Sequence, residues 1–392
     1  MNKDVLDEAV RAWAPHAPAG DVICGDMPGD AVRIGEEHIR KACVLMPSLL
    51  PLLCESLEAN GGRAVISVFG GSGVGKSEIA SLISCYLREI GIGAYTLSGD
   101  NYPRRIPLYN DAERLRVFRV GGLRGLLAQG LYSASVRAAL PDLWQAGTDP
   151  DPAAAEGCPW LAAYQQAGRE ALSGYLGQDA EQDYGELKGI VDRFRAGEDR
   201  IWLKRMGRSE DARWYDEVDF AGVNVLIIEW THGGSGRFGK VDLPVLLSST
   251  PAETRAHRRA RARDGGVDSA FTTMVLEIEQ KLIEDRAPSA ALIISKAGEL
   301  ISLAGENESY STHFDAPRSI GSASSISSFI ISAAGCSFLT RAAICPERKH
   351  PLSSSPSTAA SLRTPVPRAS SSSSGIPPYS ASQYFFAKAV RS

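Results

Sequence analysis

Residues 70 to 77 read Gly-Gly-Ser-Gly-Val-Gly-Lys-Ser and fit the spacing G-x-x-x-x-G-K-[ST] of a phosphate-binding loop, or P-loop. Glycines at these positions let backbone N–H groups close on phosphate oxygens. Lys76 would contact the β and γ phosphates, and the Ser77 hydroxyl would bind Mg²⁺. We therefore predict that the nucleotide is bound by Gly71, Ser72, Gly73, Val74, Gly75, Lys76 and Ser77.

The segments on either side of this loop support the interpretation. A β-branched run at residues 65–69 predicts a strand before the loop, and apolar residues at helical spacing from 77 to 87 predict a helix after it. The helix N-terminus would then point at the anion. A glycine-rich turn without a ligand is the alternative, and the order strand, turn, lysine, helix argues against it.

Two acidic residues follow predicted strands. Asp100 follows residues 94–98, and Glu229 ends the nearly continuous apolar run that begins at residue 223. Carboxyl ends of parallel strands share one sheet edge, so both acids should lie near the P-loop. Asp100 is then a candidate base for an acceptor hydroxyl, and Glu229 a candidate for orienting the Mg²⁺ shell. The alternatives are plain turn chemistry at Gly99-Asp100-Asn101 and a solvated acid at the end of the strand.

Arginines cluster twice in the chain. Five of them occur between residues 255 and 263, where Arg259 and Arg263 are predicted to neutralise charge on a transferring phosphoryl group. A nucleic-acid patch or a solvated helix face are the alternatives, and the net charge of −4 disfavours nucleic acid. Near Asp100, the side chains of Tyr102, Arg104 and Arg105 are predicted to line an acceptor pocket, and the paired arginines suggest an anionic acceptor.

The 392 residues fall into three predicted regions. Residues 1–60 have helical patterning that Pro47 and Pro51 should interrupt, and they form a helical preface or a regulatory or dimerising arm of a homo-oligomer. Residues 61–305 are expected to be an α/β domain: an open parallel sheet of about five strands with helices on both faces and a helical cap inserted at about 106–221. Residues 306–392 are rich in Ser and Pro and are expected to be disordered, or to come from a non-native reading frame.

Composition and motifs also bear on location. Seven cysteines lack a C-x-x-C pair, the N-terminus lacks the apolar core of a signal peptide, and no run of about 18 uninterrupted apolar residues occurs. These features predict a cytoplasmic protein with no membrane span.

With these residues in place, residues 62–300 resemble the phosphoribulokinase/uridine kinase family of P-loop kinases. The resemblance rests on the P-loop, on Asp100 with Arg104, on Glu229, on the arginine run and on Phe271-Thr272-Thr273-Met274-Val275. It implies ATP and Mg²⁺ as cofactors, a small-molecule hydroxyl acceptor, and Asp100 as the base.

The chain departs from this pattern at Asn101-Tyr102-Pro103, in the length of the arginine run and in the size of the insertion, and this leaves the acceptor open. Gly99-Asp100-Asn101 is also similar to a segment of adenylylsulfate kinases. A nucleotide-binding regulatory ATPase is the hypothesis from another class.

Overall fold

The centre of the protein is a six-stranded sheet, seen in a computed structural model that describes residues 3–261 and 269–302. The strand order is β2-β5-β1-β6-β7-β8, in which the first five strands are parallel and β8 is antiparallel. This confirms the predicted α/β class with a parallel sheet. The strands are β1 Ala64–Gly70, β2 Ala94–Ser98, β5 Val225–Glu229, β6 Leu243–Leu247, β7 Leu292–Ile294 and β8 Leu300–Ile301.

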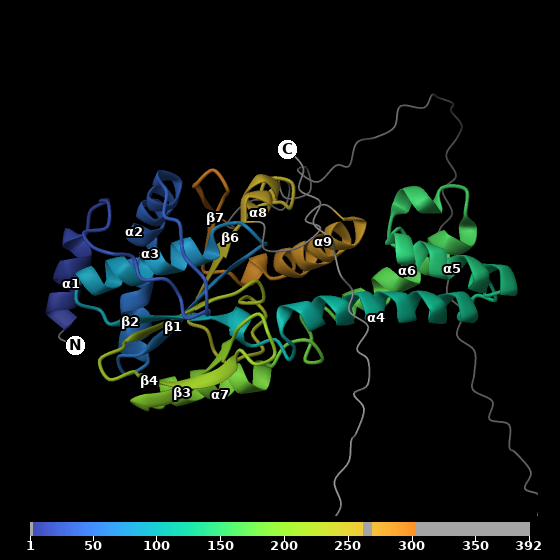
Figure 1. Cartoon of the computed structure of the whole chain (residues 1–392). Helices are drawn as coiled ribbons and strands as arrows, with labels where there is room; N and C mark the ends of the chain where they lie inside the picture. The colour runs from blue at the N-terminus through green and yellow to red at the C-terminus, as the bar shows by residue number, and fades with distance from the viewer. Residues whose placement is uncertain (1–2, 262–268, 303–392) are drawn as a thin grey trace, which may run out of the picture. The chain divides into compact units, whose positions relative to one another are not determined.

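Alternate residues of the central strands face opposite layers of the protein. On one face, Ile66 and Val68 of β1 belong to a core that includes helices α2 (Glu36–Ala59) and α3 (Lys76–Glu89). On the other face, Val65 of β1 belongs to a second core with α7 (Tyr184–Arg195). Because both faces are covered, the strands read as continuous apolar runs rather than as alternating ones. Figure 1 shows the sheet between these layers.

The N-terminal region differs from the expectation for its prolines. After α1 (Lys3–Ala12), α2 runs as one helix through Pro47 and Pro51. A proline removes one backbone hydrogen bond, but nine residues of α2 are buried, and this burial compensates for the loss. By length and composition α2 could also cross a membrane, although its buried face belongs to the core around β1.

Residues 107–173 form three helices: α4 (Pro107–Ala128), α5 (Ala134–Ala146) and α6 (Pro159–Ser173). Their apolar side chains form a separate core that also includes Met274 and Ile278 of α9 (Ala270–Glu284). The helices α4 and α6 pack closely: a Cβ atom on Gly125 would lie 2.1 Å from that of Ala167. This helical core therefore connects to the sheet domain through α9.

The second half of the insertion contains a feature that was not expected. Residues 200–219 form an antiparallel hairpin, β3 (Arg200–Met206) paired with β4 (Arg213–Asp219), within the insertion that was predicted to be a helical cap. Ile201 and Leu203 of β3 are fully buried in the core with α7, while β4 is mostly exposed. Burial of β3 thus stabilises the hairpin. The polar residues of β4 give only a weak indication of a strand in the sequence.

The remaining elements are short. They are the 3-10 turns η1 (Gly99–Asn101), η2 (Pro152–Ala155) and η3 (Ala287–Ser289), and helix α8 (Arg255–Arg261). The prediction for residues 306–392 lies outside the described residues.

Candidate active site

The P-loop connects the carboxyl end of β1 to the first turn of α3, which begins at Lys76. Gly73 and Gly75 have φ angles of 77° and 101°, a region that favours glycine and that is typical of turns whose backbone amides bind anions. The Lys76 ammonium donates a hydrogen bond to the Gly71 carbonyl at 3.1 Å, across the loop. The predicted nucleotide-binding residues therefore form one concave backbone element at a helix N-terminus.

Two side chains from other parts of the chain pack on this loop. A Cβ atom on Gly75 would lie 3.3 Å from the imidazole of His38, and one on Gly73 would lie 3.0 Å from Cγ of Arg258. Arg258 is buried and donates a hydrogen bond to Oγ1 of Thr254 at 2.5 Å. The glycines are therefore required for close approach of these neighbours as well as for their backbone angles.

In the arginine segment, a residue other than the two predicted ones contacts the P-loop. Within α8, Arg258 faces the P-loop, while the predicted Arg259 is exposed, and Arg263 lies outside the described residues. Thr254 and Arg258 are four residues apart, which places them on one helix face. The spacing can be read from the sequence, but it does not predict which face of the helix packs on the P-loop.

Glu229 connects the P-loop to the end of β2. Its Oε2 atom accepts a hydrogen bond from the Ser77 hydroxyl at 3.2 Å, and its Oε1 atom accepts one from the Ser98 hydroxyl at 2.5 Å. The sheet register places Glu229 beside Val68 of β1 and Ser98 of β2. The predicted pair Ser77 and Glu229 is thus brought together, and Ser98 is an additional member that the sequence analysis missed.

Burial disfavours the charged form of Glu229, and with the nearby charge of Asp100 it raises the pKa of Glu229 to about 8. Lys76 and the two serine hydroxyls oppose this shift. A cation bound here would favour the carboxylate further. Hydroxyl and carboxylate oxygens are the hard ligands that Mg²⁺ prefers, and this ion usually takes few protein ligands because phosphates and water supply the others. The donor set at Ser77 and Glu229 fits such an ion.

Asp100 lies in η1, directly after β2, with its side chain exposed. Its charge acts on Glu229 and also on Glu279 of α9, and the Lys76 charge acts on the same two acids. The turn passes close to β5, because a Cβ atom on Gly99 would lie 2.1 Å from the Trp230 ring. Asp100, Lys76 and Glu229 therefore share one edge of the sheet, as the strand order predicts.

The three residues predicted to line the acceptor pocket all contact other parts of the chain. Tyr102 is completely buried in the core with α7, so its ring does not line an open pocket. Arg104 contacts the Asp179 carbonyl at 2.5 Å and the Asp183 carboxylate at 3.1 Å. Both features follow from local packing: Tyr102 is apolar over most of its surface, and the acids after α6 attract the guanidinium group.

Arg105 is also engaged within the chain. Its guanidinium group donates hydrogen bonds to the Tyr175 hydroxyl and the Ala180 carbonyl, each at 3.2 Å, and lies 3.7 Å from the Glu113 carboxylate. Arg104 and Arg105 thus anchor the loop around residues 175–183.

A partly buried arginine that the sequence analysis did not single out links the helical core to the site. Arg114 of α4 contacts the Glu181 carboxylate at 2.6 Å and the Glu279 carboxylate at 3.1 Å. Burial alone would raise the pKa of Glu181, but Arg114, His232 and the Gly177 amide together outweigh burial, and the pKa is lowered. For Glu279, the effect of burial is larger than that of the Arg114 charge, and the pKa is raised. Arg114 therefore connects three elements: α4, the loop before α7, and α9. The charges of Lys76 and Asp100 also act on its partner Glu279.

The N-terminal connector, residues 13–35 between α1 and α2, also reaches the site. Cys24, Gly25, Met27, Asp30, Ala31 and Val32 line a small cavity together with Ser77 and Glu229. No local motif in the connector indicates this position. It follows from the path of the chain from α1 across the end of β2 to α2.

A search against protein-family models finds no match. The chain is similar to a curated protein from Mediterraneibacter gnavus, the bifunctional alpha-galactosidase/sucrose kinase AgaSK, with 37% identity over 238 residues. The match covers 61% of this chain and 20% of AgaSK, so this chain spans about a fifth of that relative's length.

Solved structures give weaker likenesses. A provisionally assigned fructose transport system kinase from Silicibacter sp. TM1040 has a TM-score of 0.36 and 16% identity, covering 60% of this chain and 94% of that one. A possible uridine kinase from Bacillus stearothermophilus has a TM-score of 0.32 and 15% identity, covering 62% and 98%.

Proposed function

We propose that this chain is an ATP-dependent kinase that transfers the γ-phosphoryl group to a hydroxyl of a small molecule. The observation that carries the proposal is the convergence of Lys76, Ser77, Glu229 and Asp100 at one edge of the parallel sheet. A loop that binds a triphosphate, oxygen ligands for Mg²⁺ and a carboxylate beside them are the parts that phosphoryl transfer to an alcohol needs. Residues 61–305 would form the kinase domain.

In this proposal the P-loop amides bind the phosphates and Lys76 neutralises charge on the β and γ groups. Ser77 and Glu229 would hold Mg²⁺, which would neutralise negative charge on the phosphates during transfer. Asp100 accepts the proton of the acceptor hydroxyl while that oxygen bonds to the γ-phosphorus. The bond from the γ-phosphorus to the β–γ bridging oxygen breaks, and ADP leaves with that oxygen.

Arg258 is the arginine of α8 that we propose as a source of positive charge at the phosphates, because it is buried against Gly73 of the loop. Arg259 and Arg263 remain proposals from the sequence. Helix α8 with its arginines, together with α9, supports the proposal that this chain is related to the uridine kinase and phosphoribulokinase family.

We further propose that the acceptor is a neutral sugar. The similarity to the sucrose kinase AgaSK supports a carbohydrate. The internal partners of Arg104 and Arg105 favour a neutral acceptor over an anionic one, since these guanidinium groups already contact Asp183, Glu113 and backbone carbonyls. The helical core of α4, α5 and α6 would cover the acceptor and exclude water, with Arg114 joining it to α9.

The test is to incubate the full chain with ATP, Mg²⁺ and a mixture of mono- and disaccharides, nucleosides, sugar phosphates and adenylylsulfate, and to detect phosphorylated products by mass spectrometry. We expect the wild-type chain to form a new monophosphate of one of the supplied mono- or disaccharides, and Lys76→Ala to form no new phosphorylated product. A nucleoside or adenylylsulfate product would overturn the sugar assignment but keep the kinase. ATP hydrolysis without any phosphorylated acceptor would favour a regulatory ATPase instead.

A further inference from the structure

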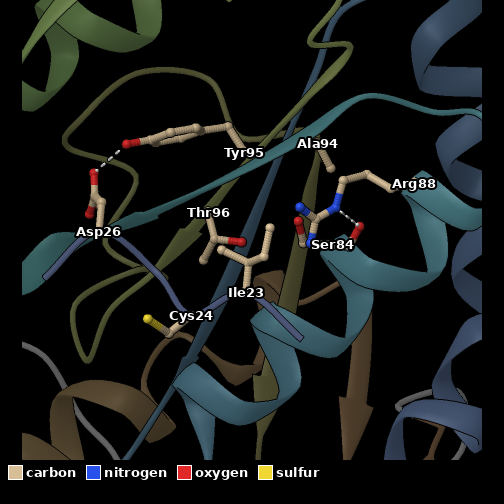
Figure 2. A pocket seen from close by; sticks show the side chains of 8 residues that line it. All are labelled: Ile23, Cys24, Asp26, Ser84, Arg88, Ala94, Tyr95 and Thr96. Atoms are coloured by element: carbon tan, nitrogen blue, oxygen red, sulfur yellow. Dashed lines mark hydrogen bonds between the residues drawn. The ribbon is translucent and has the colours of Figure 1, made fainter. Parts of the chain in front are cut away.

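A buried carboxylate of the N-terminal connector lies against the turn that contains Asp100. The side chain of Asp26 is 8% exposed. Its Oδ1 atom accepts hydrogen bonds from the Ser98 backbone amide at 2.7 Å and from Nδ2 of Asn101 at 3.1 Å. Its Oδ2 atom accepts from the Tyr95 hydroxyl at 3.0 Å and from Arg205 at 2.9 Å. Figure 2 shows the bond between Asp26 and Tyr95. Both residues line a cavity of about 180 Å³.

These contacts hold both ends of η1. Ser98 is the residue before the turn, Asn101 is its last residue, and Asp100 lies between them. The amide group of Asn101 is held on its other side as well, because its Oδ1 atom accepts a hydrogen bond from the Met206 backbone at 3.0 Å. The backbone on either side of Asp100 is therefore tied to Asp26 and to β3.

The same carboxylate is also linked to the predicted metal ligands. Ser98 bonds Asp26 through its backbone amide and Glu229 through its hydroxyl, and Glu229 bonds Ser77. A displacement of the Asp26 carboxylate would thus act at both the Asp100 turn and the Ser98 contact to Glu229.

The contacts of Asp26 are not needed merely to hold the connector against the rest of the protein. The connector is held a second time at Glu89 of α3, which contacts the His16 imidazole at 2.7 Å and the Ala19 amide at 2.8 Å. A carboxylate buried at η1 has a desolvation cost, which the four donors and the Arg205 charge offset. Because all four contacting groups donate, only an acceptor with two oxygens satisfies them together.

We propose that Asp26 is a positioning residue that sets the placement of Asp100 for proton transfer, so that the N-terminal connector is part of the active site. The inference rests on the proposed kinase function. Phosphoryl transfer is sensitive to geometry, and a misplacement of about 1 Å can lower the rate about 100-fold.

The test compares three variants of the full chain, with kcat, the KM for ATP and the KM for the acceptor measured for each. Asp26→Asn preserves shape but places an amide donor against donors, and we expect kcat to fall roughly 10- to 100-fold with the KM for ATP unchanged. Tyr95→Phe removes a contact to Oδ2 and keeps those to η1. Glu89→Gln loosens the connector far from η1. Both of these controls should retain wild-type kcat.

Hydrogen–deuterium exchange of residues 98–102 gives a second readout that needs no turnover. We expect faster exchange in Asp26→Asn and unchanged exchange in Glu89→Gln. If Asp26→Asn does not fold, Asn101→Ser is used in its place, because it removes the side-chain contacts to Asp26 and to the Met206 backbone and leaves Asp26 paired with Arg205. Wild-type kcat together with wild-type exchange would overturn the inference. A wild-type chain that phosphorylates no acceptor overturns the proposed function instead, and the exchange result still decides whether Asp26 holds the turn.

Discussion

The Ser77 hydroxyl lies 3.2 Å from Oε2 of Glu229, although 152 positions separate the two residues in the chain. The contact exists because β1 and β5 are adjacent and parallel, with Val68 opposite Glu229. The P-loop that follows β1 then returns Ser77 to the end of β5. Two side chains from distant segments, both proposed as Mg²⁺ ligands, thus meet beside the P-loop.

Replacement of Glu229 by Gln should weaken the use of Mg²⁺. Glutamine keeps the shape but has one acceptor oxygen instead of two, so it cannot accept from both Ser77 and Ser98. We expect the Mg²⁺ concentration for half-maximal rate to rise roughly 10- to 100-fold. Mg²⁺ titration of initial rates measures this. The control is Glu217→Gln, at an exposed ion pair with Arg200 on the hairpin, and an equal Mg²⁺ requirement in all three proteins would contradict the assignment.

Replacement of Asp100 by Asn should affect chemistry and spare nucleotide binding. The amide cannot accept the acceptor's proton, so kcat should fall about 10²- to 10⁴-fold, while ATP affinity measured by calorimetry changes little. Lys76→Ala should behave differently and lower both ATP affinity and kcat, because the ammonium group interacts with the phosphates before and during transfer. Wild-type turnover in Asp100→Asn would remove Asp100 from the role of base.

His232 should make the protein less stable in mild acid. Burial lowers the pKa of His232 from 6.5 to about 4, against the opposing charge of Glu181. Below the ordinary pKa the unfolded chain takes up a proton that the folded chain does not, so the free energy of unfolding falls as pH drops from about 6.5 to about 4. The loss from this group is at most roughly 3 kcal/mol.

Urea denaturation of wild type and His232→Gln at pH 7.5 and pH 4.5 measures the effect. Glutamine does not titrate, and the carboxylates other than Glu181 contribute equally to both proteins, so the variant should lose less stability between the two pH values. An equal loss in the two proteins would show that His232 does not contribute.

Close packing of α4 on α6 should make Gly125 intolerant of a side chain. A Cβ atom there would lie 2.1 Å from that of Ala167, so Gly125→Ala must separate the helices and should cost about 1–3 kcal/mol. A Cβ atom on Gly189 of α7 would meet no atom of the described residues within 4 Å, so Gly189→Ala should instead stabilise by about 0.5–1 kcal/mol. Thermal denaturation distinguishes the two, and a stabilised Gly125→Ala would contradict the packing argument.

Much of the sheet and the P-loop could be predicted because their signals are local. A glycine-rich turn between a strand and a helix places Lys76 and Ser77 without reference to the rest of the chain, and apolar runs indicate buried parallel strands. Strand order then brings Asp100 and Glu229 to the same edge. The hairpin β3–β4 and the continuity of α2 through its prolines were not predicted, because burial against other segments decided them.

By itself, then, the sequence determined the phosphate loop, the α/β class and the acids at the ends of the strands, since each depends on spacing within a short segment. Only the tertiary structure decided that Arg258 rather than Arg259 meets the loop, that Tyr102 belongs to the core, and that Asp26 holds the turn of Asp100. The physical reason is the same in all three cases. Which face of a helix or turn is buried, and which distant carboxylate satisfies its donors, depends on how separate segments pack together.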